Sequence, residues 1–160
     1  MNKIEDVLTS LPLVSNVVIT TSDEDVDNDG STRGMLEVQG MHAYFEHRKS
    51  KAIDITSVML MFEYTIFQKE KKERILEVIN SFNKTKPAIK CCLQEMPKGK
   101  IKVLFKCEAI TENDSYDLLF GVLKPSVPIL SAAPLIFSID MESKSIQHKK
   151  ITREKNEQEK

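Results

Sequence analysis

The residues with the clearest potential for chemistry form an acidic run that ends on a glycine. Residues 23–30 read DEDVDNDG. Ligand positions 1, 3 and 5 of an EF-hand calcium loop, and its glycine at position 6, are matched by Asp25, Asp27, Asp29 and Gly30. Position 12 should be a bidentate glutamate, but it is Leu36, and Glu37 comes one residue late. Because β-branched segments and not helices flank the run, the sequence favours a polar hairpin loop over a calcium site.

The same acidic run is our candidate for a partner-binding surface. An exposed patch of one charge attracts a partner of the opposite charge and accelerates their encounter. It can also imitate nucleic acid in front of the basic cleft of a nuclease toxin. The residues assigned to this surface are Asp23, Glu24, Asp25, Asp27 and Asp29.

The three cysteines do not form a metal or catalytic motif. Cys91 and Cys92 are adjacent on a predicted strand, so their side chains face opposite sides of it. A structural zinc site needs four ligands, usually in spaced pairs, and Cys107 on the neighbouring predicted strand is alone. We therefore expect three reduced thiols that act as small buried apolar residues, and no metal.

The histidines and the known catalytic signatures give no better candidate. His42 and His47 are five residues apart on a predicted strand, so they face opposite sides, and we expect both to be exposed. The sequence has no glycine-rich phosphate loop, no G-x-S-x-G and no H-E-x-x-H. We therefore expect no catalytic residues, no cofactor and a protein that is not an enzyme.

Composition predicts one soluble domain. The chain has 160 residues, a net charge of −1, 41% hydrophobic and 29% charged residues, so its charge favours neither nucleic acid nor an anionic membrane. It contains no run of about 18 apolar residues and its first residues do not resemble a secretory signal. Together with the odd number of cysteines, this predicts a cytoplasmic protein. We expect a domain over residues 1–143 and a polar tail, frayed or disordered, over 144–160.

Apolar periodicity predicts how the chain is divided into elements. The helix is most clearly marked in the middle of the chain, where apolar residues recur three and four positions apart. A turn at 97–100 predicts a hairpin, and prolines predict a kinked C-terminal helix that is capped by Thr111 or Asn113. The predicted helices are 2–10, 69–84, 115–124 and 128–141, and the predicted strands are 13–21, 35–39, 41–47, 57–67, 88–96 and 101–109.

Three stretches of this central region resemble the YbjN family, whose fold is similar to that of type III secretion chaperones. They are ILEVINSFNKTKPAIKCCLQ (75–94), GKIKVLFKCEAI (99–110) and ENDSYDLLFGVLKPSVPIL (112–130), and the resemblance covers about residues 70–140. It implies an α+β fold of order α-β-β-β-α-β-β-α, with helices packed on one face of an antiparallel sheet. It also implies no cofactor, no catalytic residues, and a role in holding another protein or in sensory regulation. The acidic run, an additional strand and the prolines depart from the family pattern.

These observations lead to three hypotheses of function. The first is a cytoplasmic, chaperone- or adaptor-like module that holds an apolar segment of an effector, a toxin or a regulator, and a homodimer is compatible with this role. The second is an immunity protein whose acidic run faces the basic cleft of a cognate toxin. The third, for which we find no base beside a thiol, is an enzyme that uses Cys91, Cys92 or Cys107.

Overall fold

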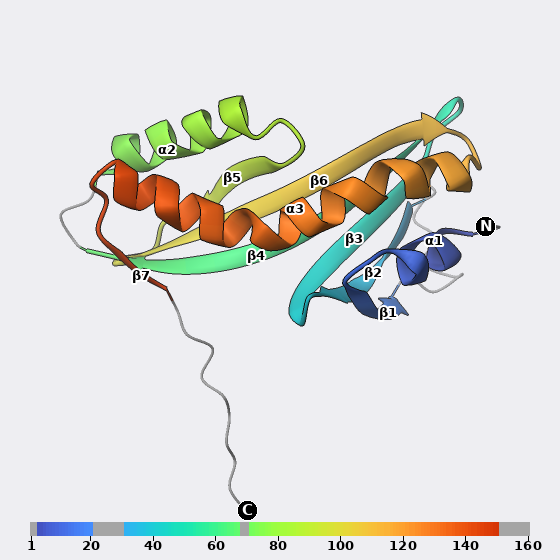
Figure 1. The fold of residues 1–160 in the computed structure, drawn as a ribbon, viewed down its shortest axis with the longest axis horizontal. Coiled ribbons are helices and arrows are strands. Elements are labelled where there is room, and N and C mark those ends of the chain that lie inside the picture. Colours follow the sequence, from blue (N-terminus) through green and yellow to red (C-terminus); the bar gives the residue numbers. More distant parts are fainter. Residues whose placement is uncertain (1–2, 21–30, 68–70, 151–160) are drawn as a thin grey trace, which may run out of the picture.

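The protein folds as an antiparallel sheet with helices on one face (Figure 1). The structure is a computed structural model that describes residues 3–20, 31–67 and 71–150. This confirms the predicted α+β class. In chain order the elements are α1 (Ile4–Ser10), β1 (Val14–Ile19), β2 (Ser31–Val38), β3 (Met41–Lys49), β4 (Ile53–Ile66), α2 (Lys72–Thr85), β5 (Lys90–Glu95), β6 (Lys100–Glu112), α3 (Tyr116–Ser143) and β7 (His148–Lys150).

The sheet is built around β4 and β6, its two longest strands. The strand order is β1-β2-β3-β4-β6-β5, and β7 pairs with the end of β4 that β3 does not reach. β4 and β6 pair from Ile53↔Glu112 to Thr65↔Lys100. The described residues contain four strands before α2, as the apolar periodicity predicts, and β7 after α3. The observed order is therefore longer than the order α-β-β-β-α-β-β-α that the resemblance implies.

Strand residues alternate between a face that the helices cover and a face that they leave open. On β4, Val58, Leu60 and Tyr64 are at most 1% exposed, while Met61 between them is 44% exposed. We call these two sides the covered face and the open face. The core on the covered face includes a cluster of aromatic rings from α2, α3, β4 and β6, whose neighbouring centroids are 5.4–6.1 Å apart. This burial is the main force that holds the helices on the sheet.

The outer edge of β5 is covered by a side chain from α2. The Asn83 amide donates to the Cys91 carbonyl (2.9 Å), and the Cys91 backbone N–H donates to Asn83 Oδ1 (2.7 Å). Asn83 therefore makes the two hydrogen bonds that a further strand would make at this position, which blocks pairing of the edge with another chain. We predicted only that Asn83 lies near the end of its helix, and α2 ends two residues later, at Thr85.

The C-terminal helix is continuous, so the prediction of two separate helical pieces was wrong. α3 has 28 residues and contains Pro125, Pro128 and Pro134. Each proline inside a helix costs about 3 kcal/mol. Six large apolar side chains of α3 are buried, and each contributes about 1.5–3 kcal/mol. Packing on the sheet therefore offsets the prolines, and the Tyr64 hydroxyl also donates to the Pro134 carbonyl (2.6 Å).

Two predicted boundaries near this helix were also displaced. The cap predicted at Thr111 or Asn113 was wrong, because β6 continues to Glu112 by pairing with β4, and Ser115 is the N-cap. The predicted end of the ordered domain at residue 143 falls too early. Ile146 is 1% exposed and β7 then pairs with β4, so the fold extends to residue 150.

Candidate functional site

The acidic run that we predicted as a partner-binding surface lies outside the described residues. This applies to Asp23, Glu24, Asp25, Asp27 and Asp29. The strands on either side of the run, β1 and β2, pair with each other antiparallel. They are the flanks that a hairpin loop has, whereas an EF-hand loop is flanked by two helices. The partner-binding role of the run stays a prediction.

Cys91 and Cys92 face opposite sides of the sheet as predicted, but the expectation that all three cysteines are buried was wrong for Cys92, which lies on the face that no helix covers. Cys91 and Cys107 are each 1% exposed on the covered face, and Cys92 is exposed on the open face. Burial raises the pKa of the Cys91 thiol far above its ordinary value, and it raises the pKa of Cys107 to about 11. A thiol attacks as its thiolate. The two buried cysteines are therefore inert at neutral pH.

One histidine is buried, against our prediction that both are exposed. His42 and His47 lie on opposite faces of β3, and the His42 side chain is 81% exposed. His47 points to the covered face and is 2% exposed. The pairing of β3 with β2 and β4 places odd-numbered β3 residues on the covered face, and periodicity alone does not tell which of two alternating sets a helix will cover.

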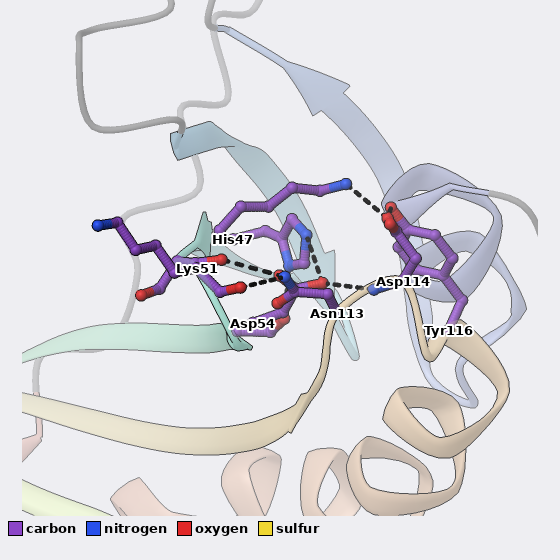
Figure 2. Close-up of polar contacts among 9 residues, drawn as sticks. His47, Lys51, Asp54, Asn113, Asp114 and Tyr116 are labelled. Carbon is purple, nitrogen blue, oxygen red and sulfur yellow. Dashed lines mark hydrogen bonds and ion pairs between the residues drawn. The ribbon is translucent and has the colours of Figure 1, made fainter.

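His47 belongs to a group of polar side chains at one end of the covered face, which we call the buried polar cluster (Figure 2). It contains His47, Asp54, Thr56 and Thr111, which are at most 4% exposed. His47 is opposite Thr56, and Asp54 is opposite Thr111. His47 Nδ1 is 2.8 Å from Thr56 Oγ1, and His47 Nε2 is 3.9 Å from Asp54 Oδ2.

The buried polar cluster continues into the turn that leads from β6 to α3. The Asp114 backbone N–H donates to Asp54 Oδ2 (3.0 Å). The Asp114 carboxylate in turn accepts from the Lys49 ammonium (2.6 Å) and from the Tyr116 hydroxyl (3.2 Å). Asn113 donates to the Ser50 carbonyl (3.1 Å) in the turn between β3 and β4 (Figure 2). These bonds tie the β3–β4 hairpin to the start of α3.

Burial controls the charge of this cluster. It lowers the pKa of His47, and the Lys49 charge acts in the same direction, whereas the carboxylates of Asp54 and Asp114 oppose the change. The hydrogen bond between Lys49 and Asp114 raises the pKa of the lysine and lowers that of the aspartate. His47 is therefore neutral at pH 7. The cluster contains residue types that are common in catalytic sites. Because the His47 ring is enclosed, a substrate cannot reach it.

Three surface cavities of the described chain lie elsewhere. One of about 610 Å³ is lined by residues that include Phe67, Lys72 and Met96, and one of about 520 Å³ is lined by Phe67 and by residues at and after the end of α3. A third, of about 360 Å³, lies on the open face beside Gly34 and Tyr44. None of these three cavities is lined by a residue of the buried polar cluster.

The outside of α3 exposes a row of large apolar side chains that no described element covers. Between residues 118 and 139 the sequence has one charged residue, Lys124. One side of the helix packs on the sheet, and on the other side large apolar residues are 37–55% exposed. We call this set the outer stripe: Leu118, Val122, Ile129, Leu135 and Ile139. A helix that is apolar on all sides is normally covered on all sides.

By length and composition alone, α3 is long and apolar enough to cross a membrane. Its most apolar window has a mean hydropathy of 1.6, and 39% of that window is buried inside the fold. Packing against the sheet accounts for the buried part. The outer stripe is the part that packing within the described chain leaves unexplained.

The open face of the sheet has a different chemistry. It also exposes large apolar side chains, among them Met35, Tyr44 and Met61. Ion pairs run between them, such as Arg33 with Glu46 (2.9 Å) and three pairs that join Lys100 to Glu63, Lys102 to Glu95 and Lys106 to Glu108. Alternation of apolar groups with paired charges is typical of a solvated sheet face.

Comparisons with protein-family models, with curated proteins and with solved structures gave no match. The resemblance to the YbjN family and to secretion chaperones therefore stays a prediction. Within the described residues, no group of three or more His, Cys, Asp or Glu side chains could hold a metal ion.

Sequence reasoning missed both the buried polar cluster and the outer stripe. A signal for the cluster is present in β4, where Asp54 and Thr56 share a face with Val58 and Leu60. Polar residues that continue an apolar strand face indicate a buried network. The signal for the outer stripe is the near absence of charge across 22 residues that contain three prolines.

Proposed function

We propose that this protein is a non-catalytic, cytoplasmic protein-binding module that holds an apolar segment of another protein on the outer stripe of α3. The exposure of five large apolar side chains on a helix with one charge between residues 118 and 139 carries the proposal. A contiguous apolar patch on a folded domain marks an interaction surface. The raised thiol pKa values of Cys91 and Cys107 and the enclosure of His47 argue against an enzyme that uses either of these two buried cysteines.

The size of the outer stripe favours a transient complex. From residue 118 to residue 139 a helix extends about 32 Å, and a helix with its side chains is about 10 Å wide. The stripe therefore offers roughly 300 Å² of its own surface, so a complex would bury about 600 Å² over both partners. Stable specific interfaces bury about 1,200–2,000 Å² over both partners. This favours the holding of a partner segment, as a chaperone or adaptor does, over an obligate homodimer.

The immunity-protein hypothesis depends on the acidic run, which lies outside the described residues. In the proposed function the same five acidic residues have a smaller role: they steer a partner with basic residues beside its apolar segment.

A comparison of paired variants in the native host tests the proposal. Tagged full-length chain is used to capture proteins in three forms: the natural sequence, Leu135→Glu with Ile139→Glu on the outer stripe, and Met61→Glu with Ile110→Glu on the open face. These four positions have similar exposure, 44–60%, so the two pairs should disturb the fold equally. We expect a defined protein that the first and third forms retain and the second form loses. Equal retention by all forms, equal loss from both variants, or no partner at all would contradict the proposal.

A further inference from the structure

The buried polar cluster has more polar atoms than it has hydrogen bonds. Among the described residues, His47 Nε2, Asp54 Oδ1 and Thr111 Oγ1 are buried without a hydrogen-bond partner. A buried polar group that lacks a partner is costly, and a buried charge is more so. The neighbouring covered-face residues of the same strands, Phe45, Val58 and Ala109, are apolar. The cluster therefore stabilises the fold less than apolar side chains at the same positions would.

The charge of Asp54 favours one tautomer of the neutral histidine. The Asp54 carboxylate lies 3.9 Å from Nε2, which is too far for a hydrogen bond, and its negative charge favours a proton on that ring atom. Nδ1 then accepts from the Thr56 hydroxyl. Asp54 Oδ2 also accepts from the Asp114 backbone N–H, at the turn before α3. One carboxylate thus faces both the titratable ring and the turn that positions the helix.

Charged and titratable side chains face His47 from β3, from β4, from the turn before α3 and from α3 itself. Asp54 on β4 and Asp114 in the turn before α3 favour a protonated ring, while Lys49 on β3 opposes it. From α3, the Tyr116 ring lies against the imidazole, with centroids 6.2 Å apart. Burial has the largest effect and keeps the ring neutral.

We propose that His47 and Asp54 form a pH-sensitive latch that fixes the start of α3 on the sheet at neutral pH and opens in acid. In the closed latch His47 is enclosed and neutral, and Asp54 holds the Asp114 backbone. In the open latch the imidazole is exposed to solvent and takes up one proton, and the Asp54–Asp114 bond is broken.

The direction of the pH effect follows from linkage. The pKa of His47 lies below its ordinary value of 6.5 when the latch is closed and returns to that value when the ring is exposed. The open form therefore binds more protons as the pH falls below about 6.5, so acid favours opening. The equilibrium constant for opening rises by up to about tenfold per pH unit until the pKa of the closed form is reached.

Hydrogen exchange at the start of α3 tests the latch. Full-length protein is compared at pH 7.5 and pH 5.5, with rates corrected for the intrinsic pH dependence of exchange, as the natural sequence and as His47→Gln and His42→Gln. The His42 side chain is exposed on the same strand, which makes it the matched control. We expect the protection of amides 114–120 to fall up to tenfold in acid in the natural sequence and in His42→Gln, and to stay unchanged in His47→Gln. An equal fall in His47→Gln, or no fall in the natural sequence, would overturn the latch.

A second measurement does not depend on a variant that folds. NMR titration of the natural protein follows the His47 ring and the Asp114 amide together. We expect both signals to change with one midpoint, below 6.5. An Asp114 amide that does not respond to titration of the ring would overturn the proposal.

Discussion

At the scale of single residues, several positions have roles that only their neighbours reveal. Gly34 on β2 pairs with Phe45 on β3 and with Ile19 on β1. A Cβ atom at Gly34 would overlap the Val18 carbonyl oxygen and the Phe45 ring. The missing side chain is therefore what allows β1 and the Phe45 ring to approach this strand.

We predict that Gly34→Ala destabilises the protein by about 3 kcal/mol or more, because backbone and ring must both move. Gly121→Ala is the control. It lies inside α3, a Cβ there meets no atom within 4 Å, and alanine should stabilise the helix by about 0.5–1 kcal/mol. Urea unfolding of both variants checks the prediction. A Gly34→Ala protein as stable as the natural one would show that β1 does not pack as described.

The cysteines give a second prediction at this scale. At pH 8 an alkylating agent should modify Cys92 within minutes in the native protein, because it is exposed. Cys91 and Cys107 should react only on unfolding, because burial raises the pKa of both thiols. Mass spectrometry should therefore show one adduct in buffer and three in denaturant. Rapid native modification of Cys107 would revive the hypothesis of a catalytic thiol.

At the scale of elements, Asn83 shows how α2 and β5 are joined. We predict that Asn83→Ala costs about 1–3 kcal/mol, since it removes two hydrogen bonds to Cys91. It also uncovers an edge strand, so the variant should aggregate more readily on warming. Asn80→Ala, at an exposed position of the same helix, should change stability by less than about 0.5 kcal/mol. Thermal unfolding with light scattering compares the two, and equal behaviour would remove the proposed role of Asn83.

The elements that sequence reasoning predicted are those with a strong local signal. The run of Ile75, Val78, Ile79 and Phe82 predicts α2, and all four residues are buried. The turn chemistry at 97–100 predicts the β5–β6 hairpin, which is present. The strand predicted over residues 57–67 overlaps β4, which begins earlier, at Ile53.

The features that were not predicted from the sequence depend on contacts between residues that are distant in the chain. Prolines in α3 predict a break, and burial against the sheet overrides it. β7 has three residues, and it forms because β3 leaves that end of β4 unpaired. The burial of His47 depends on which face of the sheet the helices cover. None of these facts is present in a local window of sequence.

At the scale of the whole molecule, the helices and the sheet have unequal outer surfaces. The open face carries paired charges among its apolar residues, whereas the outer stripe is apolar over most of a 28-residue helix. A sheet covered on one side only has to expose its other side to water. The helix layer has no such requirement, so its apolar exterior is the surface that we propose a partner covers.

The small area of the outer stripe leads to a prediction about the free protein. We expect a monomer of 18.2 kDa at micromolar concentration, because roughly 600 Å² of total burial is below what a stable dimer needs. Size-exclusion chromatography with light scattering measures the mass. A stable particle of twice this mass would show that a second copy covers part of the surface, and would favour the homodimer over transient holding.

The most direct measurement is site-specific photo-crosslinking of the full-length protein in its native host. A benzophenone side chain replaces Val122 on the outer stripe in one form and Tyr44 on the open face in the other; both positions are exposed. We expect a discrete protein adduct at position 122, reduced by Leu135→Glu with Ile139→Glu, and far less adduct at position 44. Equal adducts at both positions, or none at position 122, would contradict the claim that α3 is the binding surface.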